Sequence, residues 1–135
     1  MKKYFSLIFF LYLTSSVDGQ MDIKNYLDSI SKAEKLFRSN KYIESATLYS
    51  KTFLQNNDLG RISDRYKAAS CWALIGIADS AFYQLNKIVE KGNFSEEELI
   101  KADYNLITLQ KDQRWKTLLG NIRLNKAKKE KKVNL

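Results

Sequence analysis

Apolar residues recur at spacings of three and four in four consecutive stretches of the chain, which is the period of a helix with one buried face. In the first stretch, Asp22 is placed to cap a helix that runs to about residue 39. The apolar face of this helix comprises Ile23, Tyr26, Leu27, Ile30, Ala33, Leu36 and Phe37. The same reasoning predicts helices over residues 42–55, 62–75 and 78–91.

Short turns join these helices into two pairs, and a longer loop separates the pairs. Asn40 and Gly76 stand where a helix end favours a left-handed residue, and the sequence NNDLG at residues 56–60 predicts a loop between the pairs. The second pair is rich in small residues that let two helices approach closely: Ala68, Ala69, Ala73, Ala78 and Ala81. The pattern therefore predicts two helical hairpins.

The two hairpins overlay when the chain is shifted by 36 residues. The shift matches four pairs of positions: Asn40 with Gly76, Ala33 with Ala69, Ser45 with Ala81, and Tyr49 with Leu85. A helix–turn–helix unit that recurs at this distance predicts a repeat array.

Residues 24–92 resemble tetratricopeptide repeats. The family pattern has a small residue in the middle of the first helix (Ala33, Ala69), and in the second helix a small residue (Ser45, Ala81) followed four positions later by a large one (Tyr49, Leu85). The first copy departs from it at Asn40, Ser29 and Lys32, and both copies lack the terminal proline. The resemblance implies a right-handed array whose concave groove is lined by the first helix of each hairpin.

Residues 93–122 are expected to close the array. Ser95 and Glu98 have the spacing of a capping box for a short helix. The stretch 103–119 resembles the closing segment of many bacterial tetratricopeptide modules, which leads into a final helix. We expect this helix over residue 113 to about residue 128, fraying in the lysine run. Four apolar residues would cover the open end: Trp115, Leu118, Leu119 and Ile122.

Composition supports one all-α domain. The 135 residues include no proline and five glycines, so few turns are expected. The net charge of +8 is concentrated near the end, because residues 123–132 hold six basic residues against Glu130. We therefore divide the chain into a domain at 20–122 and a lysine-rich tail at 123–135. The tail could bind nucleic acid or anionic lipid through charge, although such a run is more often a solvated end.

Residues 1–19 have the pattern of a signal peptide. Lys2 and Lys3 precede an apolar run over residues 4–13, and Val17 and Gly19 suit cleavage before Gln20. The run is short for a membrane span. We expect an exported, periplasmic or secreted protein with no stable membrane span after cleavage. An uncleaved membrane anchor is the alternative.

Candidate chemistry is sparse. The absence of histidine removes the commonest general base and metal ligand, and Cys71 is the single cysteine. We expect Cys71 to be buried and inert, and Trp72 to belong to the core. Asp103, Asp112 and Arg114 form the most polar cluster, which we interpret as a helix cap and a salt bridge. The sequence thus predicts no enzymatic activity, no cofactor and no metal.

The resemblance directs the search for function to the concave groove. Five residues are expected to line a peptide-sized site there: Glu34, Phe37, Arg38, Tyr66 and Ser70. The first hypothesis is an exported, non-catalytic module that binds a peptide or protein, with no nucleic-acid partner. The alternative is a structural or assembly subunit that docks onto a larger cell-envelope complex without a peptide pocket. Two repeats are fewer than a solenoid usually needs, so a homodimer stays open as well.

Overall fold

The computed structural model describes residues 21–134, and all regular secondary structure in this part of the chain is helical. Its elements in order are α1 (Ile23–Arg38), α2 (Tyr42–Gln55), α3 (Ile62–Leu74), α4 (Ala78–Glu90), α5 (Glu97–Ala102), the 3-10 helix η1 (Tyr104–Lys111) and α6 (Gln113–Val133). The predicted all-α class is confirmed. The predicted signal peptide at residues 1–19 lies outside the described residues.

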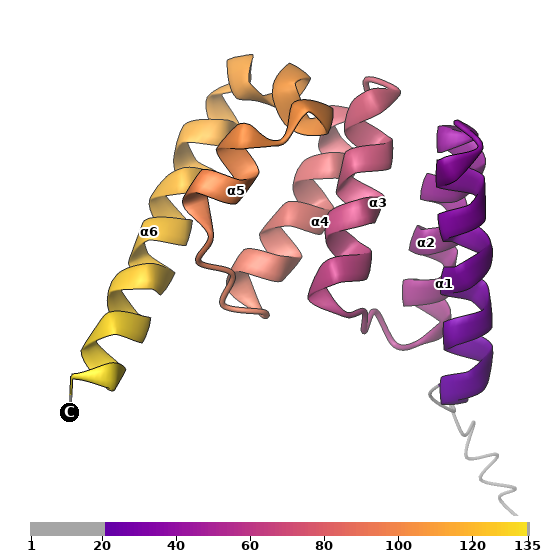
Figure 1. Ribbon diagram of the computed structural model, residues 1–135, viewed down its shortest axis with the longest axis horizontal. Coiled ribbons are helices and arrows are strands. Elements are labelled where there is room, and N and C mark those ends of the chain that lie inside the picture. Colours follow the sequence, from indigo (N-terminus) through magenta and orange to yellow (C-terminus); the bar gives the residue numbers. More distant parts are fainter. Residues whose placement is uncertain (1–20, 135) are drawn as a thin grey trace, which may run out of the picture.

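The helices form an array of side-by-side pairs (Figure 1). α1 packs on α2 at one end, and α3 packs on α4 in the middle. α2 joins the two hairpins through its contact with α3. At the other end, η1 packs on α3 and α6 packs on α4, so the closing segment covers the second hairpin. No helix within residues 21–134 combines the length and the apolar character that crossing a membrane requires.

Two clusters of buried side chains make up the core. One lies between the first hairpin and α3 and is built around Tyr49, Phe53 and Cys71. The other joins α3 and α4 to the closing segment and includes Leu85, Leu106 and Ile122. Trp72 packs against both clusters, and its indole nitrogen donates to the Ser50 hydroxyl at 3.1 Å. The prediction that Trp72 belongs to the core is confirmed.

The turns inside the two hairpins have the same backbone geometry. Asn40 and Gly76 both have a left-handed backbone, with φ of 59° and 78°. The amide of Lys41 donates to the Leu36 carbonyl, and 36 positions later the amide of Ile77 donates to the Trp72 carbonyl, both at 2.9 Å. This six-to-one bond is the helix-ending motif that a left-handed residue permits. The 36-residue shift found in the sequence therefore superimposes two turns that have the same backbone geometry.

Two of the three predicted N-terminal helix caps do not form as expected. Asp22 precedes α1, but its side chain makes no capping hydrogen bond. The capping box at Ser95 is wrong, because α5 begins after Glu96, whose carboxylate accepts a hydrogen bond from the Ser95 hydroxyl at 3.4 Å. Asp112 does cap α6, accepting from the Arg114 amide at 2.9 Å.

The closing segment covers the end of the array as expected. Trp115, Leu118 and Ile122 are buried, and Leu119 is partly buried against the same cluster. The expected end of α6 near residue 128 is wrong, because the helix continues to Val133. Lysine is a good helix former, and cations at a helix C-terminus interact favourably with its dipole. The lysine run therefore extends the helix.

Candidate partner-binding surface

Three of the five predicted groove residues lie on α1. Arg38 is exposed, while Glu34 is partly exposed and forms an ion pair with Lys67 of α3. Phe37 is half-buried, with its ring centroid 5.5 Å from that of Tyr42. Glu34 and Arg38 therefore belong to an open surface, whereas Phe37 supports the turn between α1 and α2.

The other two residues lie beneath the closing segment. Ser70 is only 3% exposed, and its hydroxyl donates to the Tyr66 carbonyl at 3.1 Å. The Tyr66 ring packs against Phe94 at 6.1 Å, and burial raises the pKa of its hydroxyl. Next to them, the Thr108 hydroxyl of η1 donates to the Ala73 carbonyl at 3.3 Å. Ser70 thus does not line an open groove, because η1 packs on this face of α3.

An open stripe remains along α1. Ile23 and Leu27 are 69% and 43% exposed, and they share one helical face with Glu34 and Arg38. The neighbouring wall comes from the loop before α3 and from α3 itself. We call the combined surface the α1 groove: Ile23, Leu27, Leu59 and Arg61 line a hollow, and Glu34, Arg38 and Lys67 are surface residues farther along α1 and α3.

One end of the α1 groove deepens into a recess of about 790 Å³. Its lining residues are Met21, Ile23, Tyr26, Leu27, Asn56, Leu59, Gly60 and Arg61. Leu59 is 53% exposed although it is apolar. Sequence reasoning missed this recess because Ile23 was assigned to the buried face and Leu59 stands in a polar loop. That lone leucine in the loop NNDLG is the signal that could have indicated it.

A buried carboxylate fixes the wall of the recess. Asp64 is 1% exposed and accepts a hydrogen bond from the Tyr26 hydroxyl and another from the Arg61 Nε, both at 2.7 Å. The Tyr26 oxygen accepts in turn from the Arg61 amide at 3.1 Å. Burial raises the pKa of Tyr26, so the hydroxyl stays protonated and remains a donor. The side chains of Tyr26 and Arg61 are therefore held in place by charge-assisted bonds.

A second polar cluster holds the loop that carries Leu59. Asp58 accepts from Arg65 Nη2 at 2.9 Å, from Lys87 at 2.5 Å and from the Tyr83 hydroxyl at 3.0 Å. Partial burial favours a raised pKa at Asp58, but the hydrogen bonds from Lys87, Arg65 and Tyr83 together lower it to about 2. The carboxylate is thus charged at neutral pH, and the loop is tied to α3 and α4.

Arg65 itself is a buried cation, 4% exposed. Its Nη1 donates to the Gln84 side chain at 2.7 Å, and its guanidinium lies 4.6 Å from the centre of the Phe53 ring. Each of these contacts stabilises a desolvated charge. Arg65 is therefore a structural link between α3, α4 and the loop.

The polar cluster of the closing segment is structural, as predicted. Arg114 forms ion pairs with Asp112 and with Asp79 of α4, both at 2.7 Å, and its guanidinium lies 4.4 Å from the centre of the Phe82 ring. Asp103 caps η1 by accepting from the Asn105 amide at 2.9 Å. These residues fasten the closing segment to the second hairpin.

Cys71 is buried, as predicted, with 0% exposure. Burial raises the pKa of its thiol, which therefore stays protonated and unreactive. Within residues 21–134, no group of three or more acidic or sulfur-bearing side chains is placed to hold a metal ion.

No family model, curated protein or solved structure matches the chain. The resemblance to tetratricopeptide repeats therefore stays a prediction, and the geometry of the α1 groove is the remaining indication of function.

Proposed function

We propose that the chain is an exported, non-catalytic interaction module of the tetratricopeptide type that binds an extended peptide segment of a protein partner. The observation that carries the proposal is the α1 groove, where an apolar recess of about 790 Å³ continues into a stripe of charged side chains. Pockets that combine an apolar anchor site with a few placed polar groups are typical of recognition sites.

The charges of the α1 groove favour one class of peptide. Arg61 is neutralised by Asp64, and Glu34 is paired with Lys67, which leaves Arg38 as an exposed cation along the stripe. A suitable segment would place an apolar side chain in the recess between Leu27 and Leu59. It would place an acidic side chain near Arg38. A peptide with a basic side chain at that position would be repelled by Arg38.

The rigid wall of the groove supports the same proposal. The bonds that join Tyr26, Arg61 and Asp64 fix one side of the recess before any ligand arrives. A preformed site spares the entropy of ordering side chains on binding.

Affinity capture with matched charge variants tests the proposal. Leu27→Glu with Arg38→Glu changes the α1 groove, and Leu54→Glu with Lys51→Glu makes the same change in charge on α2. Leu54 is 70% exposed and Lys51 is exposed, so the control leaves the core intact. A partner captured by the unaltered protein should be lost with the first variant and retained with the second. Retention by both would overturn the groove and favour the assembly-subunit alternative.

Export is tested separately, because it depends on the pattern of residues 1–19. N-terminal sequencing of the protein recovered from outside the cytoplasm should begin at Gln20. Recovery of the whole chain from the cytoplasm would contradict export and leave the test of the α1 groove unaffected.

A further inference from the structure

The C-terminal part of α6 extends beyond the body of the array (Figure 1). Asn125 is the last residue of α6 whose side chain is hydrogen-bonded to the body of the array: its amide donates to the Val89 carbonyl at 2.8 Å and to the Phe94 carbonyl at 3.0 Å. Every residue from 126 to 134 is exposed. We call residues 126–134 the overhang.

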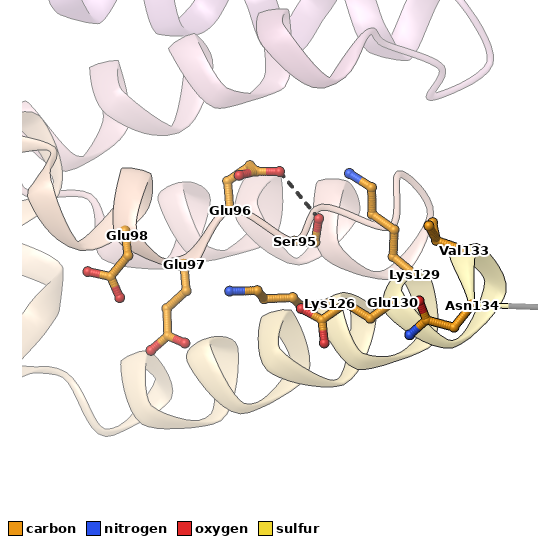
Figure 2. A pocket seen from close by; sticks show the side chains of 9 residues that line it. All are labelled: Ser95, Glu96, Glu97, Glu98, Lys126, Lys129, Glu130, Val133 and Asn134. Atoms are coloured by element: carbon orange, nitrogen blue, oxygen red, sulfur yellow. Dashed lines mark hydrogen bonds between the residues drawn. The ribbon is translucent and has the colours of Figure 1, made fainter.

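On one side of the overhang, carboxylates more than balance the lysines. A recess of about 390 Å³ lies there, and Glu96, Glu97, Glu98 and Glu130 line it together with Lys126 and Lys129 (Figure 2). The Glu97 carboxylate is ion-paired with Arg123 at 2.6 Å. The hydrogen bond from Arg123 lowers the pKa of Glu97, and the charge of Lys126 contributes in the same direction. An incoming anion would meet carboxylates on this side.

The other side has no such balance. A recess of about 360 Å³ is lined by two amide side chains and four lysines: Asn93, Asn125, Lys128, Lys129, Lys131 and Lys132. No carboxylate belongs to this lining. We call this site the lysine recess. The four ammonium groups and the Asn93 amide are able to donate hydrogen bonds, which suits an anionic ligand with several acceptor oxygens, whereas the Asn125 amide already donates to the Val89 and Phe94 carbonyls.

The helix itself would gain from an anion at this site. Lys128 is three residues from Lys131 and four from Lys132, so these like charges are neighbours on the helix surface. Such like-charge pairs destabilise a helix. A bound phosphate would relieve this repulsion and stabilise the overhang.

We propose that the lysine recess binds the phosphate headgroups of an anionic lipid surface and attaches the protein peripherally to it. A lysine ammonium is a compact charge that suits phosphate, and each lysine of a cluster at a membrane surface multiplies the affinity by a similar factor. The overhang carries no aromatic residue and no arginine that could stack on or read a base. Lipid is therefore the better match.

Attachment at this site would leave the α1 groove accessible. α1 and α6 lie at opposite ends of the array (Figure 1). A protein held by its overhang would therefore have the α1 groove at the other end of the array from the lysine recess. The proposal does not depend on the α1 groove, since a failure of peptide binding would leave the lysine recess unchanged.

Vesicle sedimentation tests the lysine recess. The protein from Gln20 to Leu135 contains both core clusters, and its binding to phosphatidylcholine vesicles with and without phosphatidylglycerol would be measured. We expect binding only to the anionic vesicles, and weaker binding as salt increases. Lys128→Gln with Lys131→Gln and Lys132→Gln should weaken binding about 100-fold, since each lysine contributes about fivefold. Circular dichroism would verify that every variant folds.

Two controls separate the recess from net charge. Lys24→Gln with Lys32→Gln and Lys51→Gln removes the same charge from exposed positions of the first hairpin and should retain most of the binding. Within the overhang, Lys126→Gln should weaken binding less than Lys132→Gln, because Lys126 faces the glutamates. Equal losses in the two triple variants, no vesicle binding at all, or tighter binding to a DNA duplex than to anionic vesicles would each overturn the proposal.

Discussion

The Tyr26 hydroxyl in α1 donates a hydrogen bond to Oδ2 of Asp64 in α3, with 2.7 Å between the two oxygens. The bond connects the first hairpin to the second across the wall of the recess. Because Asp64 is 1% exposed, its carboxylate oxygens cannot form a replacement hydrogen bond with water if the donor is removed. Loss of a hydrogen bond to a buried charged group is costly.

Tyr26→Phe should therefore lower the free energy of unfolding by about 1.5 kcal/mol, since Asp64 keeps Arg61 as its other partner. Urea unfolding followed by circular dichroism measures the change. Tyr42→Phe is the matched control, because it removes a hydroxyl bonded to Asn40 at the surface. It should cost less than about 0.5 kcal/mol. Equal effects of the two substitutions would show that burial of Asp64 adds nothing to the bond.

The buried charges were the part of the fold that sequence reasoning did not predict. Asp64 and Arg65 follow one another near the start of α3, where a charged pair is usually solvated. Their burial depends on partners that are distant in the chain, namely Tyr26 for Asp64 and Gln84 for Arg65. Local periodicity contains no information about such partners. The wall of the recess could therefore not be predicted.

The hairpin turns give a prediction based on the repeat. Gly76 has a φ of 78°, and its counterpart Asn40 has a φ of 59°. Gly76→Ala should lower the free energy of unfolding by about 1 kcal/mol, because a Cβ is unfavourable in this backbone conformation. Gly76→Asn should cost less, since asparagine tolerates the left-handed region.

The space around Gly76 makes this test clean. No atom lies within 4 Å of a Cβ built at Gly76, so a loss of stability would come from the backbone and not from a clash. Urea unfolding of Gly76→Ala, Gly76→Asn and the reciprocal Asn40→Gly measures the effect. A larger loss for Gly76→Asn than for Gly76→Ala would contradict the equivalence of the turns.

The turns and the first four helices were predictable because their determinants are local. The apolar period and the residues Asn40 and Gly76 set the ends of α1 to α4 within about two residues. Ser70 was placed incorrectly because its environment is set by η1, which follows it by more than 30 residues. The end of α6 was misplaced because the lysine run was expected to fray, whereas lysine is a good helix former. Residues that other segments cover are thus the ones that a periodic pattern cannot assign.

Asp58 should make the stability of the protein depend on pH in the acid range. Its pKa is lowered from 3.8 to about 2 in the folded protein, so the folded state binds this proton less readily than the unfolded state. The stabilisation is complete above pH 3.8 and is lost as the pH falls toward 2. Thermal unfolding between about pH 5 and pH 2 would measure it.

Asp58→Asn identifies the contribution of this carboxyl. Asparagine preserves the left-handed backbone of the loop, where Asp58 has a φ of 53°, but it cannot ionise. The variant should be less stable than the parent at neutral pH, and the difference between them should shrink as the pH approaches 2. A difference that stays constant across this range would show that the ion pairs with Arg65 and Lys87 add no stability.

Cys71 should resist thiol reagents in the folded protein. The side chain has 0% exposure, and burial raises the pKa of the thiol, while the hydroxyl of Ser45 at 3.4 Å acts in the opposite direction. Modification then requires opening of the core, so labelling at neutral pH should be at least about 1,000-fold slower than in urea. Reaction with a chromogenic disulfide reagent measures both rates. Ser39→Cys in a Cys71→Ala background supplies an exposed control thiol, which should react at a similar rate in both conditions. Rapid labelling of native Cys71 would mean that the contact between the first hairpin and α3 opens readily, and that the wall of the α1 groove is not rigid.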